Sequence, residues 1–351
     1  MACNLKVWLM VSFILLPSVF GVPQVPCLFI MGDSLFDNGN NNDLVTEAKA
    51  NYPPYGIDFP QGPTGRFSNG KNMADFIGVP GPLIALGFGK PIPPFASTAT
   101  DDQEILMGVN YASGAAGIRD ETGYQLGDRI SLKRQLLNHQ TIVSRITYRL
   151  GSKEAAADYL SKCIYLVNIG SNDYINNYLM PQNYPTNVLY NPDQYADVLN
   201  QQYSELLKIL YNEGARKIAL FGLGLIGCIP AEIANYGANG CVDMVNKDVQ
   251  LFNIGLDLLV NDLNRDLADA QFIYINVTEI SSGDPSVFGI TVTNAPCCIV
   301  STTIAKGQCA PNLAPCDNRS MYAFYDGFHP TQIAGKLLAA GAYTYLPPLI
   351  L

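Results

Sequence analysis

Residues 27–35 read Cys-Leu-Phe-Ile-Met-Gly-Asp-Ser-Leu, an apolar run that stops at a glycine. Consecutive apolar residues are typical of a strand that is buried on both faces of a parallel sheet. Gly32 permits a sharp turn after this strand, and Ser34 then stands at the start of the next element. A serine in this position can act as a nucleophile, but only if a general base lies within hydrogen-bond reach of its hydroxyl.

Histidine is the usual base near neutral pH because its unperturbed pKa is ~6.5. The chain has two histidines. His139 lies in a polar stretch with a helical pattern, so we expect it on the protein surface. His329 ends the sequence Tyr-Asp-Gly-Phe-His at 325–329, where Asp326 can fold back onto the imidazole Nδ1 and fix its tautomer. Asp-x-x-His alone also fits an ordinary turn or half of a metal site. Together with Ser34 it predicts a catalytic triad.

Two other stretches can supply hydrogen-bond donors for the oxyanion of an acyl-transfer reaction. Residues 110–118, Asn-Tyr-Ala-Ser-Gly-Ala-Ala-Gly-Ile, contain glycines that let a backbone N–H approach the reacting centre. Asn172 follows the apolar run 164–169, so its amide is expected to extend from the end of a second strand. Gly114 and Gly117 are equally compatible with tight packing or turns, and Asn172 with a helix cap.

These motifs occur in one order along the chain. They are Gly-Asp-Ser-Leu at 32–35, the glycine block near 114, Gly-Ser-Asn-Asp at 170–173 and Asp-x-x-His-Pro at 326–330. In this order they resemble the GDSL esterase/lipase family of the SGNH hydrolases. The blocks at 36–42, 64–70, 214–217 and 223–230 resemble its plant branch: Phe-Asp-Asn-Gly-Asn-Asn-Asn, Thr-Gly-Arg-Phe-Ser-Asn-Gly, Gly-Ala-Arg-Lys and Leu-Gly-Leu-Ile-Gly-Cys-Ile-Pro.

The resemblance implies a role for each motif. Ser34 is the expected nucleophile, His329 the base and Asp326 the acid that orients the base. Three donors are expected to form the oxyanion hole: the N–H of Ser34, the N–H of Gly117 (with Gly114 in reserve) and the side-chain amide of Asn172.

Two positions depart from the family pattern. Tyr325 stands where many plant relatives carry Trp, and Leu225 where many carry Pro. Neither position bears a catalytic group, so the departures concern the shape of the pocket and leave the chemistry unchanged.

Strand-like runs at 27–31, 105–111, 163–169, 216–222 and 271–277 alternate with helical patterns. One helix is predicted to begin at Asn191-Pro192 and another to run from 243 to 269. This alternation predicts an α/β fold with a parallel sheet covered on both faces. The resemblance implies the SGNH hydrolase form of it, a three-layer α/β/α fold with a flavodoxin-like, five-stranded parallel sheet. The candidate site residues would then meet at the carboxyl edge of the sheet.

Residues 22–351 are expected to form a single domain, since no linker, internal repeat or low-complexity run divides them. The Pro- and Gly-rich segment from 52 to 95 is long for a connection. We interpret it as a structural surface loop. The alternative is that it walls the acyl pocket, with residues 91–95 as an apolar lip.

Residues 1–21 are expected to be a secretory signal peptide, with Lys6, an apolar core from 7 to 16, and small or neutral residues at Val19 and Gly21. The core is shorter than the about 20 residues that span a bilayer. We therefore expect a secreted, extracellular protein of the apoplast or cell wall, with no integral membrane segment. Two sequons, at Asn276 and Asn318, could carry glycan in that compartment.

Eight of the nine cysteines follow the expected cleavage point, which favours disulfides in an oxidising compartment. Cys228 and Cys241 flank one loop, and four more cysteines lie between 297 and 316. A tetrathiolate zinc site is the rival, although the adjacent pair at 297–298 fits the spacing of such sites poorly. Cys27 and Cys163 begin two runs that are expected to be neighbouring strands, so they either pair or are both buried thiols.

The net charge of −9, with only 15% charged residues, argues against binding to nucleic acid or to anionic membranes through a basic face. The sequence therefore predicts a secreted serine hydrolase of carboxylic esters that works through an acyl-enzyme, with no cofactor or metal. Its substrate would be a small-molecule, lipid or polysaccharide ester. Two alternatives stay open: an acyltransferase that uses the same residues, and a catalytically silent cell-wall or defence binding protein. Acyl chain length and oligomeric state are not predicted.

Overall fold

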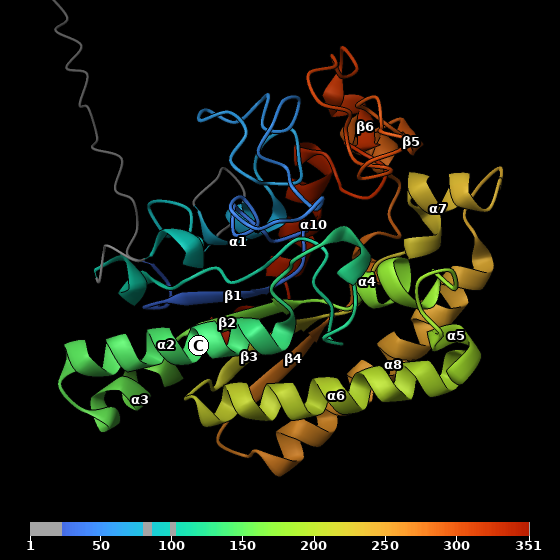
Figure 1. The fold of residues 1–351 in the computed structure, drawn as a ribbon. Coiled ribbons are helices and arrows are strands. Elements are labelled where there is room, and N and C mark those ends of the chain that lie inside the picture. The colour runs from blue at the N-terminus through green and yellow to red at the C-terminus, as the bar shows by residue number, and fades with distance from the viewer. Residues whose placement is uncertain (1–22, 80–85, 99–102, 351) are drawn as a thin grey trace, which may run out of the picture.

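The computed structural model describes residues 23–79, 86–98 and 103–350. A parallel sheet lies between two layers of helices (Figure 1), which confirms the predicted α/β fold. The expected signal peptide at 1–21 lies outside the described residues.

The central sheet has four parallel strands in the order β1-β2-β3-β4. They are β1 Leu28–Gly32, β2 Ile164–Asn168, β3 Lys217–Phe221 and β4 Gln271–Ile275. Gly32 at the end of β1 lies opposite Asn168 at the end of β2, so the loops that carry Ser34 and Asn172 leave neighbouring strand ends. The four runs that form these strands were all predicted as strands.

The fifth predicted strand, 105–111, does not form. Residues Glu104–Met107 make a 3₁₀ turn, and only Asn110 bridges Ile30 of β1. Gly108 has φ 116° and lies so close to Leu28 that a Cβ there would be 1.8 Å from the Leu28 carbonyl oxygen. Past Gly108 the chain runs beside β1, where the Val109 carbonyl accepts the Ile30 N–H at 3.0 Å and the Ile30 carbonyl accepts the Tyr111 N–H at 2.7 Å. On its other side Asn110 bridges Pro94.

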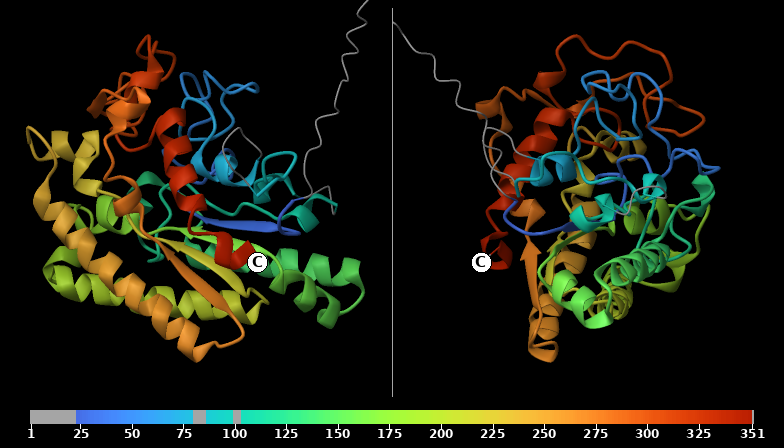
Figure 2. Two further views of the ribbon diagram at one scale, coloured as in Figure 1. Left: turned by 180° about the vertical axis from the view of Figure 1, so that it is seen from behind. Right: turned by 90° about the vertical axis from the view of Figure 1, so that its left-hand side faces the viewer.

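Helices cover both faces of the sheet (Figure 2). The apolar side chains of the strands alternate between two cores, one on each face. Phe29 and Met31 of β1 face the core under α2 Leu132–Leu150, α6 Pro192–Asn212 and α8 Asp243–Asp266. Leu28 and Ile30 face the opposite core, under α1 Met73–Gly78 and α10 Gln332–Tyr343. Burial on both faces explains why the strands read as continuous apolar runs.

The other helices are short. They are α3 Lys153–Ser161, α4 Ser171–Asp173, α5 Thr186–Leu189, α7 Pro230–Asn235, α9 Val277–Ile280 and α11 Pro347–Ile350. A π-helical turn, Tyr174–Tyr178, continues α4.

The two long helices begin as predicted. Asn191 caps α6: its side chain accepts the Gln194 N–H at 2.9 Å, while the Gln194 side chain accepts the Asn191 N–H at 3.1 Å. This reciprocal pair is a capping box, and Pro192 occupies the first helical position. Helix α8 begins at the predicted Asp243 but ends at Asp266, three residues before the predicted 269.

The prediction that His139 lies on the surface is wrong. Its side chain is fully buried on the inner face of α2, against Phe29 and Tyr165 of the sheet. The Tyr111 hydroxyl lies 3.0 Å from His139 Nδ1, and burial lowers the pKa of His139 to about 3, so the ring is neutral. A polar side chain can lie on the buried face of a helix when it finds such a partner.

The eight cysteines that follow the expected cleavage point form four disulfides: Cys27–Cys163, Cys228–Cys241, Cys297–Cys316 and Cys298–Cys309. The disulfide interpretation is thus confirmed over the tetrathiolate alternative. The last two cross-link the segment between β5 Val292–Pro296 and β6 Tyr322–Phe324, a separate parallel pair.

In the segment from 52 to 95, Ile92 is buried in the core under α1 and α10. Residues 91–95 therefore do not form the apolar lip that was the alternative interpretation. Phe67 is the one described residue of this segment that lines the cavity at Ser34 and His329.

Candidate active site

Ser34 lies in the loop after β1, and the end of that strand is tightly constrained. A Cβ at Gly32 would be 2.4 Å from the Asn168 carbonyl oxygen, so only glycine fits there. Gln135 of α2 accepts the Gly32 N–H at 2.9 Å and donates to the Gly32 carbonyl at 2.7 Å. The backbone two residues before Ser34 is thus fixed between β2 and α2.

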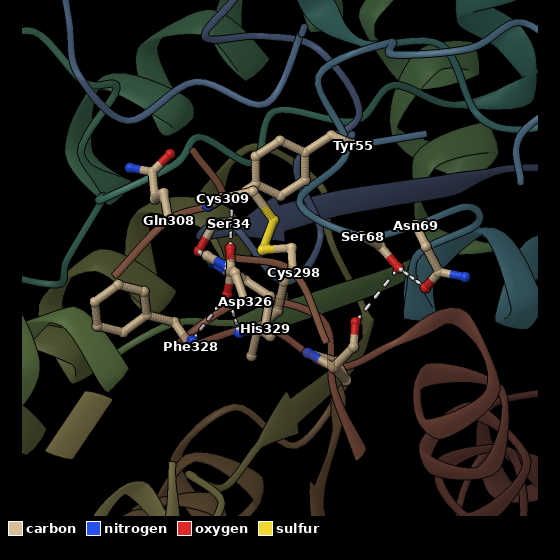
Figure 3. Close-up of polar contacts among 12 residues, drawn as sticks. Ser34, Tyr55, Ser68, Asn69, Cys298, Gln308, Cys309, Asp326, Phe328 and His329 are labelled. Carbon is tan, nitrogen blue, oxygen red and sulfur yellow. Dashed lines mark hydrogen bonds and ion pairs between the residues drawn. A yellow bond between two sulfur atoms is a disulfide. The ribbon is translucent and has the colours of Figure 1, made fainter. Parts of the chain in front are cut away.

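The structure brings Ser34, His329 and Asp326 into one hydrogen-bonded chain (Figure 3). Ser34 Oγ lies 2.7 Å from His329 Nε2, and His329 Nδ1 lies 2.8 Å from Asp326 Oδ2. With the serine hydroxyl donating to Nε2, the neutral ring carries its proton on Nδ1 and donates it to Asp326. This is the tautomer that a general base requires.

Asp326 has no exposed surface, yet its carboxylate is well supplied with donors. Oδ1 accepts the backbone N–H groups of Phe328 and His329, each at 2.8 Å. Oδ2 accepts the hydroxyl of Tyr55 at 2.5 Å in addition to the imidazole. A buried charge is tolerated only when it is compensated in this way. The Asp-x-x-His spacing explains the local donors, but it gave no indication of Tyr55.

Asn172 lies in α4, directly after β2, and lines the cavity beside Ser34. Its Nδ2 donates one proton to the Ala116 carbonyl at 3.0 Å, and its Oδ1 accepts from Asn176 at 2.7 Å. These contacts fix the orientation of the amide, and they leave the second Nδ2 proton for another acceptor.

The glycine block reaches the cavity through Ala115. Gly114 donates its N–H to Asp37 Oδ2 at 2.9 Å, and a Cβ at Gly117 would meet Thr122 and Asp173. Neither glycine lines the cavity, whereas Ala115 between them does. Ala115 has φ 63°, a left-handed conformation that is uncommon for alanine. A search for glycines misses this residue because no motif marks it.

Buried carboxylates surround the serine. Burial raises the pKa of Asp33 to about 7, and its Oδ2 has no hydrogen-bond partner among the residues described. Burial also raises the pKa values of Asp37 and Asp173 to about 6, although both carboxylates accept backbone N–H bonds. Asp173 accepts from Ile118, Arg119 and Thr122, and so ties the glycine block to α4.

Ser34 and His329 open into a cavity of about 430 Å³ with mostly apolar walls. One wall comes from α9 and the turn after it, another from α10, and a third from β6 and the loop after β3. The apolar residues on these walls include Leu225, Ile226, Ile229, Val277, Ile280, Phe288, Ile290, Phe324, Phe328, Leu337 and Leu338. Lys306 and Gln308 of the disulfide-linked segment line the cavity as well.

Within residues 23–79, 86–98 and 103–350, no group of three or more His, Cys, Asp or Glu side chains is arranged to hold a metal ion. No helix in this part of the chain is long and apolar enough to span a membrane. Of the two sequon asparagines, Asn318 is exposed, whereas Asn276 is partly buried and caps α9 by accepting the Glu279 N–H.

A parallel α/β sheet with serine, histidine and aspartate in hydrogen-bond contact at its carboxyl edge has the architecture of a serine hydrolase. The comparisons with known proteins identify the family. The chain belongs to the GDSL-like lipase/acylhydrolase family, whose model matches residues 28–341. It is a carboxylic ester hydrolase, and small-molecule or lipid esters are the substrates that such a family implies.

Two GDSL esterase/lipases of Arabidopsis thaliana are 49% and 48% identical to this chain. The matches cover 91% and 92% of this chain and 87% and 89% of the relatives. Both confirm the resemblance to plant GDSL enzymes. Among solved structures, the OSK domain of Drosophila Oskar matches at 12% identity over 55% of this chain and 69% of that one, with a TM-score of 0.24, too low to carry an argument.

Proposed function

We propose that this protein is a secreted esterase that uses Ser34, His329 and Asp326 in an acyl-enzyme mechanism. His329 Nε2 takes the Ser34 proton as Oγ attacks the ester carbonyl, and Asp326 stabilises the imidazolium that forms. The imidazolium then protonates the departing alcohol. His329 next removes a proton from water, which attacks the acyl-enzyme and releases the carboxylic acid. The observation that carries the proposal is the unbroken Ser34–His329–Asp326 chain at the cavity wall.

The oxyanion would be held by the Ser34 N–H, the Asn172 amide and one backbone N–H of the glycine block. Gly117 was the sequence prediction for that donor, with Gly114 in reserve. The cavity wall favours Ala115 instead, because Gly114 already donates to Asp37 and neither glycine reaches the cavity. Each such donor is commonly worth about 3 kcal/mol of transition-state stabilisation.

The substrate we propose is an ester with an extended apolar acyl chain. The walls contributed by α9, α10 and β6 are almost wholly aliphatic or aromatic, so a hydrocarbon chain gains burial there while a sugar hydroxyl would lose its hydration. An acetyl group would leave most of the 430 Å³ unused. Apolar acyl esters therefore fit the cavity better than acetylated sugars do.

Secretion is part of the proposal. Four disulfides fit an oxidising compartment, and residues 1–21 have the composition of a signal peptide. The exposed Asn318 is the better of the two candidate glycosylation sites, since Asn276 is engaged as a helix cap. Peptide mapping of the secreted protein, before and after glycosidase treatment, tests both sites and locates the mature N-terminus.

The test of the mechanism combines a substrate panel with active-site labelling. The wild type should hydrolyse p-nitrophenyl esters with a preference for long chains, and a fluorophosphonate should modify Ser34 alone, with Ser34→Ala inert in both assays. Labelling at another serine would refute the assignment. Repeating the assay with an added alcohol distinguishes the acyltransferase alternative from hydrolysis, because a transferase passes the acyl group to the alcohol and forms a new ester. Failure to turn over any ester would favour the silent binding protein.

A further inference from the structure

Tyr55 lies in the long connection between β1 and α1, far in sequence from every motif of the site. Its side chain is 1% exposed. Its hydroxyl donates to Asp326 Oδ2 at 2.5 Å and accepts the backbone N–H of Cys309 at 3.1 Å. Figure 3 shows the ring beside the Cys298–Cys309 disulfide, with Asp326 and His329 next to it.

The two contacts of this hydroxyl fix the direction of its proton. Because the Cys309 N–H occupies a lone pair of the oxygen, the O–H is left to point at Asp326. Burial and the nearby Asp326 raise the pKa of Tyr55 well above its usual value of 10.0, so the hydroxyl keeps its proton. Tyr55 is therefore a permanent donor to the carboxylate.

The ring itself has little freedom. Its centroid lies 5.3 Å from that of Tyr52, 6.1 Å from that of Phe67 and 5.9 Å from that of Tyr325, all in edge-to-face contacts. These rings form one buried cluster with the cysteines of two disulfides, Cys297, Cys298 and Cys309. The hydroxyl is thus held by a rigid, cross-linked part of the molecule.

We propose that Tyr55 is a positioning residue for the catalytic carboxylate, and that it links Asp326 to the cross-linked segment 297–316. The inference rests on the proposed Ser34–His329–Asp326 mechanism. Two backbone N–H groups hold Oδ1, and Tyr55 is the donor on Oδ2 that keeps the carboxylate from rotating about its bond to Cβ. By sharing the negative charge, it also moderates the pull of Asp326 on the imidazole proton.

Three other titratable groups interact with Asp326 or His329. Asp33, after β1, interacts electrostatically with His329, and Tyr52 and Tyr325 with Asp326. Burial raises the pKa values of both tyrosines, so they stay neutral over the pH range of a rate measurement. Asp33, whose pKa burial raises to about 7, titrates within this range in the wild type and in the variants alike. A change in the pH profile relative to the wild type on loss of the Tyr55 hydroxyl therefore reports its contact with Asp326.

Tyr52 provides a matched control. It is in the same segment and the same aromatic cluster, but its hydroxyl donates to the Cys309 carbonyl at 3.0 Å and does not contact Asp326. Tyr52→Phe therefore removes one hydroxyl and one hydrogen bond to Cys309 without touching the carboxylate. Tyr325→Phe is a second control, because that hydroxyl donates to the Pro54 carbonyl at 2.6 Å.

The test is steady-state kinetics of Tyr55→Phe and Tyr52→Phe on a p-nitrophenyl ester from pH 4 to 9. For Tyr55→Phe we expect kcat to fall roughly 10- to 100-fold with KM within about twofold. The acid limb of kcat/KM should move up by about half a pH unit or more, since a less neutralised carboxylate stabilises the imidazolium. Tyr52→Phe should keep the wild-type profile. Equal kcat and equal profiles in both variants would overturn the proposal.

Two further measurements keep the outcome unambiguous. Fluorophosphonate labelling of the wild type reports on Ser34 itself, so a failure of the proposed mechanism is seen independently of Tyr55. If Tyr55→Phe does not fold, fluorinated tyrosine introduced at position 55 alone preserves shape and strengthens the donor. The acid limb should then move to lower pH, and an unchanged limb would contradict the role assigned to Tyr55.

Discussion

Gln135 holds Gly32 by both of its backbone groups. The Gln135 side chain accepts the Gly32 N–H at 2.9 Å and donates to the Gly32 carbonyl at 2.7 Å, although the two residues are 103 positions apart. Both groups are fully buried, so no solvent replaces these bonds if the amide is lost. The loop that carries Ser34 is therefore fixed by a side chain from α2.

Gln135→Leu is expected to lower both stability and activity. It leaves the buried Gly32 N–H without its partner and removes a donor from the carbonyls of Gly32 and Ile130, although the Gly32 carbonyl still accepts the Ser113 N–H. These losses should cost about 2 to 5 kcal/mol in the free energy of unfolding. The freed loop should also lower kcat because Ser34 loses its fixed position. Gln140→Leu on the same helix is the control, since Gln140 contacts Glu213 in a partly exposed pair and should cost less than about 1 kcal/mol. Denaturant unfolding and ester hydrolysis measure both effects, and equal losses in the two variants would contradict the role of Gln135.

Asn172→Ala should lower kcat by roughly 10²- to 10³-fold with little change in KM, the usual result of losing one oxyanion-hole donor. Asn176→Ala removes only the group that bonds Asn172 Oδ1, so it should have a much smaller effect. If Asn172→Ala raised KM while leaving kcat intact, Asn172 would be a binding residue and not an oxyanion donor.

Asp33 should make the protein less stable as the pH rises from about 4 to about 7. Its folded-state pKa is about 7, against a usual value of 3.8, because burial opposes the charged form. Between these values the folded chain retains a proton that the unfolded chain has lost, so stability falls through this window and then levels off. The free energy of unfolding of Asp33→Asn should therefore rise relative to that of the wild type by about 2 to 4 kcal/mol between pH 4 and pH 8. Thermal unfolding of both proteins across this range is the measurement, and parallel curves would rule out the raised pKa.

Ile280 of α9 lines the apolar wall of the cavity beside Gly341 of α10, which makes it a test of substrate class. Ile280→Trp should fill this space and lower kcat/KM for C12–C16 esters by roughly 10-fold or more, with acetate hydrolysis nearly unchanged. Ile254→Trp, on the exposed face of α8, is the control for adding an indole. A uniform loss over all chain lengths would indicate damage to the catalytic centre instead of a shortened acyl site.

Local pattern explains which parts of the fold and site could be predicted. Continuous apolar runs in the sequence predict four of the strands, and the position of Ser34 directly after one of them predicts the nucleophile. Asp326 and His329 are three residues apart, so their contact is a property of one loop. Tyr55 contacts Asp326 across 271 positions, and no local pattern reports such a contact.

The failures have physical causes of the same kind. His139 and Gln135 are polar, yet both lie on the buried face of α2 because each has a hydrogen-bond partner there. The helical pattern alone therefore predicts that His139 lies on the surface. The run 105–111 reads as a strand, but its first residues form a 3₁₀ turn and Gly108 approaches Leu28 closely, so only the residues after Gly108 bond to β1.

The Cys298–Cys309 disulfide should matter more to catalysis than Cys27–Cys163 does. Cys309 donates its N–H to Tyr55 and Cys298 donates its N–H to the Tyr325 carbonyl, directly before Asp326, whereas the other disulfide joins the start of β1 to the start of β2. Each disulfide should contribute about 2 to 4 kcal/mol to stability. We expect Cys298→Ala/Cys309→Ala to lose activity under conditions where circular dichroism is still native, and Cys27→Ala/Cys163→Ala to unfold more easily but keep its kcat while folded.

Gentle reduction of the wild type should likewise abolish ester hydrolysis before the fold is lost. Activity that survived full reduction, or six or more free thiols in the secreted protein, would contradict this coupling.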